Sequence, residues 1–227
     1  MSPFAARLEE HLRQLRALRG DAKRAPARLA ELKRWQAARL QGTYADYASQ
    51  PRYAAATAFF IDDLYGPKDF SSRDQSMLRI LPVMTRLLPA SAVETAAIAI
   101  ELEALSEDLD HRLAAALAPG AITEESYAQA YRKSATRAER ERQVALIDAA
   151  GRRLDDVVKR PMLGQTLKLM RRPARLAGLA DLQDFLERGF DAFREMKGAD
   201  EFLAEVKRRE TGILSRLFSG APRPFST

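Results

Sequence analysis

Helix-capping sequences and the helical spacing of apolar residues constrain this chain more than any other feature. A serine or threonine followed three residues later by an acid is the capping box that opens an α-helix. Apolar residues then recur at intervals of three and four, as on the buried face of a helix. Because no stretch alternates convincingly between hairpin turns, we predict no strands. The three boxes are Ser71-Ser-Arg-Asp74, Ser91-Ala-Val-Glu94 and Thr136-Arg-Ala-Glu139.

The expected helices cover most of the 227 residues and are separated by Gly and Pro. We therefore predict an all-α, multi-helix bundle of about seven to nine helices. Pro82 should kink the helix that opens at Ser71, while Pro161, Pro173 and Gly178 should divide shorter helices. The other predicted helices span residues 3–18, 26–41, 52–65, 91–117, 136–159, 180–197 and 199–217.

The first two helices are predicted to form an N-terminal basic hairpin. Residues 1–40 contain ten Lys or Arg against four Asp or Glu, whereas residues 41–151 contain eleven against sixteen. The last residues are rich in Gly, Pro and Ser, which is typical of a disordered tail. We predict an amphipathic basic helical hairpin (1–42), a helical body (43–218) and a disordered tail (219–227).

Composition excludes several classes of chemistry. The chain has no cysteine, which excludes disulfides, thiolate catalysis and cysteine-ligated metals. No apolar run approaches the roughly 18 residues of a membrane span, and the N-terminal residues lack the apolar core of a secretory signal. We therefore expect a cytoplasmic protein and leave open a peripheral position at the inner membrane.

The segment from Phe59 to Phe70 is the most distinctive in the chain, and it reads Phe-Phe-Ile-Asp-Asp-Leu-Tyr-Gly-Pro-Lys-Asp-Phe. Helical spacing places Asp63 on one face with Phe59 and Phe60, at the edge of an aromatic stripe. A carboxylate in that position needs a partner. It is either an acid or base with a raised pKa or one half of a structural ion pair, and ion pairs of this kind are the more common.

This segment resembles the element that names the bacterial FFLEELY-motif proteins. Here Ile61 replaces the leucine, and Asp62 and Asp63 replace the two glutamates. Leu182-Gln-Asp-Phe-Leu-Glu-Arg-Gly-Phe190 and the later Phe202-Leu203 are also similar to that family's C-terminal part. The resemblance implies an uncharacterised helical protein of bacteria and brings no known activity or catalytic residue.

Further carboxylates gather on the predicted helix 91–117. Glu101 and Asp108 recur at a seven-residue interval beside its apolar stripe, so they join Asp63 as candidate catalytic residues. Asp108-x-x-His111 is the pattern nearest to the paired motifs of di-iron bundles. The chain has only two histidines, His11 and His111, so we predict neither a metal site nor a cofactor.

Residues 152–175 are strongly basic and contain interleaved leucines and methionine. Such a segment can lie on an anionic membrane or bind an acidic partner, or it can form an ordinary surface paired with the acidic middle of the chain. No aromatic stacking platform or helix-turn-helix accompanies it, which disfavours nucleic acid. The candidate anion-binding or ligand-binding residues are Phe60, Lys168, Arg171, Arg172 and Arg175.

Three classes of function follow from these patterns. The favoured one is a helical binding protein that engages an acidic or apolar small ligand, or an anionic membrane surface, through the basic segment. The second is a protein–protein scaffold or homo-oligomer that uses the N-terminal hairpin as a docking arm. The third is a helical-bundle enzyme with a carboxylate site. Binding is favoured because catalytic patterns are weak, and enzymatic activity stays open.

Overall fold

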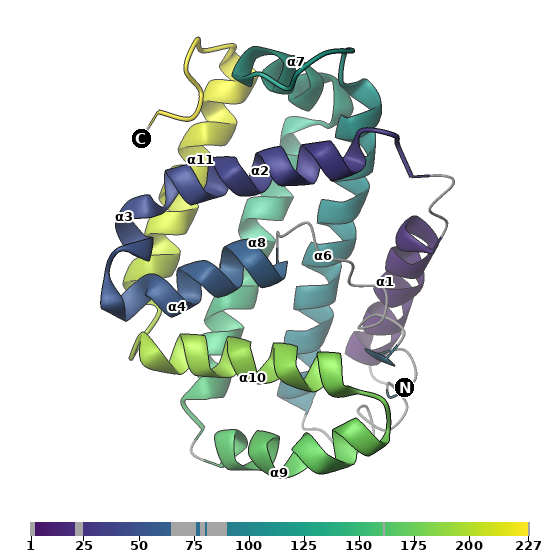
Figure 1. The fold of residues 1–227 in the computed structure, drawn as a ribbon, viewed down its shortest axis with the longest axis vertical. Coiled ribbons are helices and arrows are strands. Elements are labelled where there is room, and N and C mark those ends of the chain that lie inside the picture. The colour runs from purple at the N-terminus through teal and green to yellow at the C-terminus, as the bar shows by residue number, and fades with distance from the viewer. Residues whose placement is uncertain are drawn as a thin grey trace.

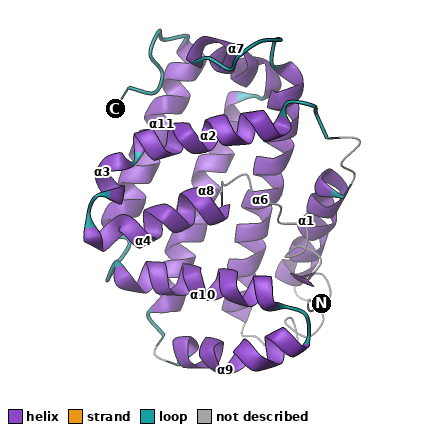
Figure 2. Cartoon of the chain, viewed as in Figure 1, coloured by secondary structure: helices purple, strands orange, loops and turns teal. Residues whose placement is uncertain are grey.

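The computed structural model describes residues 3–20, 25–64, 76–77, 80, 90–160 and 162–226. These residues form ten α-helices and one π-helical segment and contain no strand, which confirms the predicted all-α bundle (Figure 2). The elements are α1 (Pro3–Arg19), α2 (Leu29–Thr43), α3 (Ala45–Ala48), α4 (Pro51–Phe59), η1 (Phe60–Leu64), α6 (Ala90–Ala116), α7 (Glu124–Ser134), α8 (Arg137–Val158), α9 (Leu163–Leu176), α10 (Ala180–Glu195) and α11 (Asp200–Ser219).

Two layers of helices enclose the main core. The long helices α6, α8 and α11 run side by side with α8 in the middle, and α2, α4 and α10 cross them (Figure 1). Aromatic and aliphatic side chains fill the space between the layers, as the helical spacing of the C-terminal phenylalanines predicts. The buried members include Tyr53, Phe59, Phe190, Phe193, Met196, Phe202, Leu203 and Val206.

The two N-terminal helices, predicted to form a hairpin, each pack on α6 (Figure 1). Leu8, Leu12 and Leu15 of α1 are completely buried. Glu107 of α6 accepts hydrogen bonds from Arg19 of α1 at 2.8 Å and from Lys33 of α2 at 2.7 Å. Paired directly, the two basic helices would repel each other, whereas the acidic face of α6 neutralises both.

Of the three predicted capping boxes, one forms, one does not, and one lies outside the described residues. Thr136 forms its box: its backbone N donates to Glu139 Oε2 at 2.7 Å, and its Oγ1 accepts from the Glu139 backbone N at 3.3 Å. Ser91 lies inside α6, and Glu94 instead pairs with Arg153 at 2.8 Å. The Ser71 box and the Pro82 kink lie outside the described residues.

Two boundaries differ from the predicted ones. Helix α7 was missed, although Thr123 and Ser126 form a reciprocal cap at its start. Pro173 lies within α9 and does not divide it. One missing backbone donor near the end of a short helix is tolerated where the next residues turn away.

Residues 220–226, expected to belong to a disordered tail, have specific contacts. Arg216 donates from Nε to the carbonyl of Pro224 and from Nη2 to the carbonyl of Ser226, both at 2.8 Å. The ring of Phe225 packs edge-on against Trp35. A tail rich in Gly, Pro and Ser is typically disordered. Here the segment is ordered because Phe225 packs on an aromatic surface of the folded chain.

Candidate functional site

The signature segment changes helix type where its two aspartates begin. Pro51 opens α4 at its first turn, and after Phe59 the chain widens into the π-helical segment η1. A π-helical turn rotates the following side chains relative to a regular helix and is frequent at functional sites. Here Asp62 is exposed and Asp63 is buried. Tyr65 to Phe70, the rest of the signature, lie outside the described residues.

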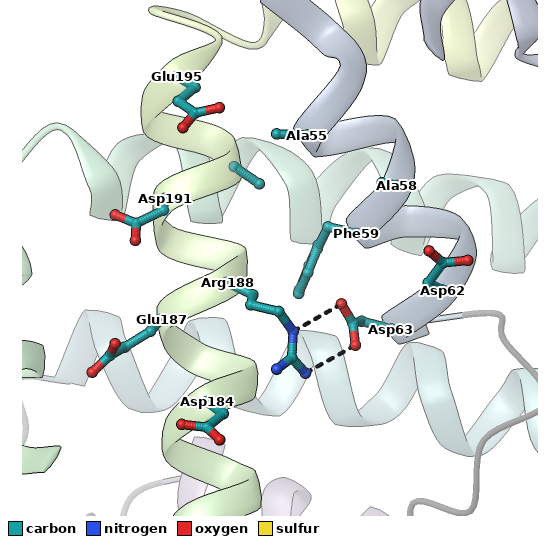
Figure 3. Close-up of a pocket in the computed structure, with 11 residues that line it drawn as sticks. Ala55, Ala58, Phe59, Asp62, Asp63, Asp184, Glu187, Arg188, Asp191 and Glu195 are labelled. Carbon is teal, nitrogen blue, oxygen red and sulfur yellow. Dashed lines mark hydrogen bonds and ion pairs between the residues drawn. The ribbon is translucent and has the colours of Figure 1, made fainter.

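Asp63 forms an ion pair with an arginine from a distant helix. Arg188 of α10 donates from Nε to Asp63 Oδ2 at 3.1 Å and from Nη2 to Oδ1 at 2.9 Å (Figure 3). The Asp63 side chain is 7% exposed and that of Arg188 is 53% exposed. This two-pronged geometry is a strong form of charge-assisted hydrogen bonding. It matches the ion-pair interpretation and gives Asp63 no feature of a general acid or base.

An open groove of about 640 Å³ lies between α4–η1 and α10 (Figure 3). Its lining combines acidic side chains with the alanines of both helices and the ring of Phe59. Arg188 is the one basic side chain among the lining residues. The six carboxylates that line it are Asp62, Asp63, Asp184, Glu187, Asp191 and Glu195.

A glycine allows the two helices that line the groove to lie close together. A Cβ on Gly189 would lie 2.7 Å from Cζ of Phe59, which is closer than side-chain atoms pack. The absence of a side chain thus lets Phe59 reach the α10 backbone and pack at a tilt against Phe185, with ring centroids 5.3 Å apart. Gly189 therefore permits the close approach of α4 and α10.

The other two candidate carboxylates lie away from Asp63. Glu101 binds Arg7 and Arg142, and His11 Nε2 lies 3.9 Å from it. Burial would raise the pKa of Glu101, but hydrogen bonds from Arg142 and Arg7 lower it overall. Neither Glu101 nor Asp108 lines the groove with Asp63, so these carboxylates do not form one catalytic centre there.

Asp108 pairs with Arg112, one turn away on α6, at 3.0 Å. His111 turns toward Glu107, with Nε2 and Oε1 3.5 Å apart. Across the described ranges, no group of three or more His, Asp or Glu side chains is arranged to hold a metal ion.

The four basic candidates all lie on α9 but face two directions. Arg171 points toward α10 and binds Glu187, with Nε 2.7 Å from Oε1. Lys168, Arg172 and Arg175 are exposed and have no ion-pair partner among the described residues. The basic segment thus presents three uncommitted charges on one side of a short helix.

Apolar side chains on the outer surface of α9 accompany these charges. Met162 is 76% exposed, Leu169 is 77% exposed and Leu176 is 90% exposed. Their seven-residue spacing places them on one side of the helix. Met170, at 47%, lies next to this stripe. No other described helix exposes large apolar side chains to this degree.

Phe60 does not join the basic candidates. It is half-buried and packs on the aromatic core between the two layers. Within the part of the chain that the structure describes, no helix is long and apolar enough to cross a membrane.

Sequence reasoning missed Arg188 and the acidic row on α10. Asp184, Glu187, Asp191 and Glu195 follow one another at intervals of three and four, which is a visible signal for a single charged helix face. The pairing of Asp63 with Arg188 spans 125 residues and leaves no local signal.

Comparison with known proteins places the chain in a family without assigning it an activity. No curated protein and no solved structure matches it. The model of a family described as a domain of unknown function, DUF8198, matches residues 15–224. This agrees with the expected uncharacterised family, while the resemblance to the FFLEELY-motif proteins stays a prediction. Because that match covers most of the sequence, the chain belongs to the DUF8198 family.

Proposed function

We propose that this protein binds anionic membrane surfaces through α9. The observation behind the proposal is the combination, on one short helix, of an exposed apolar stripe and three basic residues that form no ion pair with any described residue. An amphipathic helix of this kind lies in the plane of a membrane interface. Its apolar side chains enter the acyl boundary, while its cations stay at the phosphates.

The angular positions of the side chains fit this orientation. At about 100° per residue, Met162, Leu169 and Leu176 lie within about 40° of one another around the helix axis. Lys168, Arg172 and Arg175 lie to one side of this stripe, about 60° to 120° from Leu169. The methylene stems of such cations can lie along the apolar boundary while their charged ends reach the headgroups.

The inward face of α9 attaches the helix firmly enough to serve as a platform. Gly164 and Ala174 are buried, and Gln183 of α10 donates to the carbonyl of Leu167 at 2.6 Å. The Arg171–Glu187 pair adds a charged link. Membrane contact would then use a helix that is already folded, without the entropic cost of ordering a free segment.

The two alternatives have weaker support. The docking-arm hypothesis needs an accessible apolar stripe on α1, yet Leu8, Leu12 and Leu15 are buried within the chain. The enzyme hypothesis needs uncommitted carboxylates, yet Asp63 and Glu101 are bound by arginines. An apolar small ligand between Phe60 and the basic helix also has less support, since no α9 residue lines the groove among the described residues.

Vesicle co-sedimentation tests the proposal. The full chain should bind vesicles that contain phosphatidylglycerol and bind poorly to pure phosphatidylcholine. Replacing Lys168, Arg172 and Arg175 by Gln should weaken binding about 100-fold, since each cation near an anionic surface contributes about 1 kcal/mol. Replacing Leu169 and Leu176 by Gln should weaken binding at constant charge.

A matched control removes the same charge elsewhere. Arg34, Lys133 and Lys197 are exposed and have no ion-pair partner among the described residues. Their triple Gln variant should keep most of the vesicle affinity. Equal losses in the two triple variants would reduce the effect to net charge and exclude α9 as the binding surface.

A further inference from the structure

Phe225 occupies an aromatic slot on the opposite end of the molecule from α9. The floor of the slot is a stacked pair, Trp35 of α2 and Tyr127 of α7, whose ring centroids are 4.4 Å apart. Phe225 meets both rings edge-on, at 5.6 Å from Trp35 and 5.7 Å from Tyr127. The guanidinium carbon of Arg39 lies 5.6 Å from the Phe225 centroid. Ring edges and a cation on aromatic faces are favourable contacts for one inserted aromatic side chain.

Phe225 does not fill the site. A pocket of about 370 Å³ remains beside the ring, lined by Phe225 and by Trp35, Arg39 and Gly42. This volume lies within the range of pockets that hold small ligands.

The charges around the pocket are also incompletely matched. Arg39 is bound by Glu210 at 2.9 Å, so its charge is already neutralised. Glu124, on the rim, is exposed and has no ion-pair partner among the described residues. Arg223, two residues before Phe225, likewise pairs with none of them. A cation on a bound segment, close to its inserted aromatic ring, could therefore form an ion pair with Glu124.

The segment that supplies Phe225 has an irregular backbone and is held by side-chain contacts. After the left-handed cap at Gly220, which has φ +75°, residues 221–226 form no regular structure. Two hydrogen bonds from Arg216 to main-chain carbonyls hold this stretch over α11. Pro222 and Pro224 keep the unbound segment extended, which lowers the entropic cost of inserting the ring again.

We propose that this slot is a binding site for an aromatic side chain on a basic, proline-containing segment of another polypeptide, and that Phe225 is its intramolecular competitor. The chain's own tail displays the chemistry that the slot accepts. Its occupation regulates access, because a partner must displace Phe225 before its own ring can reach Trp35 and Tyr127. The proposal is independent of membrane binding by α9.

The test uses the full-length chain with Phe225→Ala and a capped, fluorescent peptide, Ala-Pro-Arg-Pro-Phe-Ser, which copies residues 221–226. Peptide anisotropy measures binding, and the emission of Trp35, the one tryptophan in the chain, reports on the slot. The variant should bind the peptide saturably and at least tenfold more tightly than the unaltered protein. A peptide with Ala in place of Phe should not bind.

A second variant protects the test against misfolding of the first. Arg216→Gln removes the two tail hydrogen bonds and leaves every slot residue in place, so it should also increase peptide affinity, by a smaller factor. The thermal unfolding of both variants is followed by circular dichroism. Equal affinity in all three proteins, or no binding to any of them, would overturn the proposal.

Discussion

Helices α9 and α10 are consecutive and similar in length, with 14 and 16 residues, but the fold uses them in opposite ways. On α10, Phe190 is 6% and Phe193 is 7% exposed, so its apolar side chains complete the core. On α9, Leu169 and Leu176 are 77% and 90% exposed. Both sequences are amphipathic. Amphipathicity therefore identifies an apolar face, while the arrangement of neighbouring helices decides whether that face is covered.

The charges of the two helices repeat this contrast. Lys168, Arg172 and Arg175 of α9 have no ion-pair partner in the described part of the chain, whereas Arg188 of α10 binds Asp63 and Arg194 binds Asp191. Charges that are already paired contribute to the internal structure, and unpaired ones remain available to an external ligand. This contrast is consistent with a stabilising role for α10 and supports the proposed binding role of α9.

Truncation of one apolar side chain on each helix gives the largest expected difference. Phe193→Ala should destabilise the fold by about 3–5 kcal/mol, because the variant leaves a cavity in a close-packed core. Leu176→Ala should change the free energy of unfolding by less than about 0.5 kcal/mol, since the side chain is already in water. Urea unfolding followed by circular dichroism measures both. Comparable losses would mean that the exposed face of α9 is covered in solution.

The close contact on α10 provides the next test. Gly189→Ala should destabilise the fold by about 1–2 kcal/mol, because overpacking against Phe59 exceeds the gain in helix propensity. Gly42→Ala is the matched control: a Cβ there would meet no atom within 4 Å, so it should stabilise α2 by up to about 1 kcal/mol. Phe59→Leu combined with Gly189→Ala should recover part of the loss. A neutral Gly189→Ala would disprove the close approach.

Sequence patterns predicted the helices well where local chemistry determines them. The Thr136 cap and the apolar spacing of residues 180–217 lie within single helices, and the structure confirms them. These features depend on neighbours three or four residues away, so a single sequence contains them.

Long-range pairings could not be predicted in the same way. The choice of Arg188 as the partner of Asp63, and the packing of α1 on α6 instead of α2, depend on which surfaces meet after folding. The sequence identified the basic residues of α9 as candidates, but it could not reveal that Arg171 alone among them pairs with Glu187 of α10. Nor did the composition of the tail predict the slot that receives Phe225, because its walls come from distant helices.

The ion pair at the acidic groove should have a smaller effect than core truncation. Asp63→Asn should destabilise the fold by about 1 kcal/mol, because it weakens a bidentate ion pair. The effect is modest because the Arg188 side chain is half-exposed to solvent. Asp184→Asn, an exposed neutralisation in the same groove, should have almost no effect. In a cycle with Arg188→Gln, coupling of at least about 0.5 kcal/mol is expected in urea unfolding. Additive losses would show that the pair makes no net contribution.

The link between the two helices should respond to pH. The pKa of Glu187 is lowered, first by the hydrogen bond from Arg171 and also by that from Gln183. Because the folded carboxyl binds its proton less readily than the unfolded one, this stabilisation is present above the unfolded pKa of about 4.5. It is lost as the pH falls through the lower, folded value.

Amide hydrogen exchange of α9 measures this effect, which should be the smallest of the four. In the unaltered chain, protection of α9 amides should decrease as the pH falls below about 4.5, after correction for the intrinsic exchange rate. Glu187→Gln should lower protection at neutral pH and flatten its pH dependence. The pKa of Arg171 is raised by its hydrogen bond to Glu187 and also by the charges of Asp191 and Asp184. Asp184→Asn therefore serves as the control and should keep the pH-dependent decrease in protection. If Glu187→Gln retained the full decrease in protection, the pH-dependent link between α9 and α10 would have to involve another carboxylate.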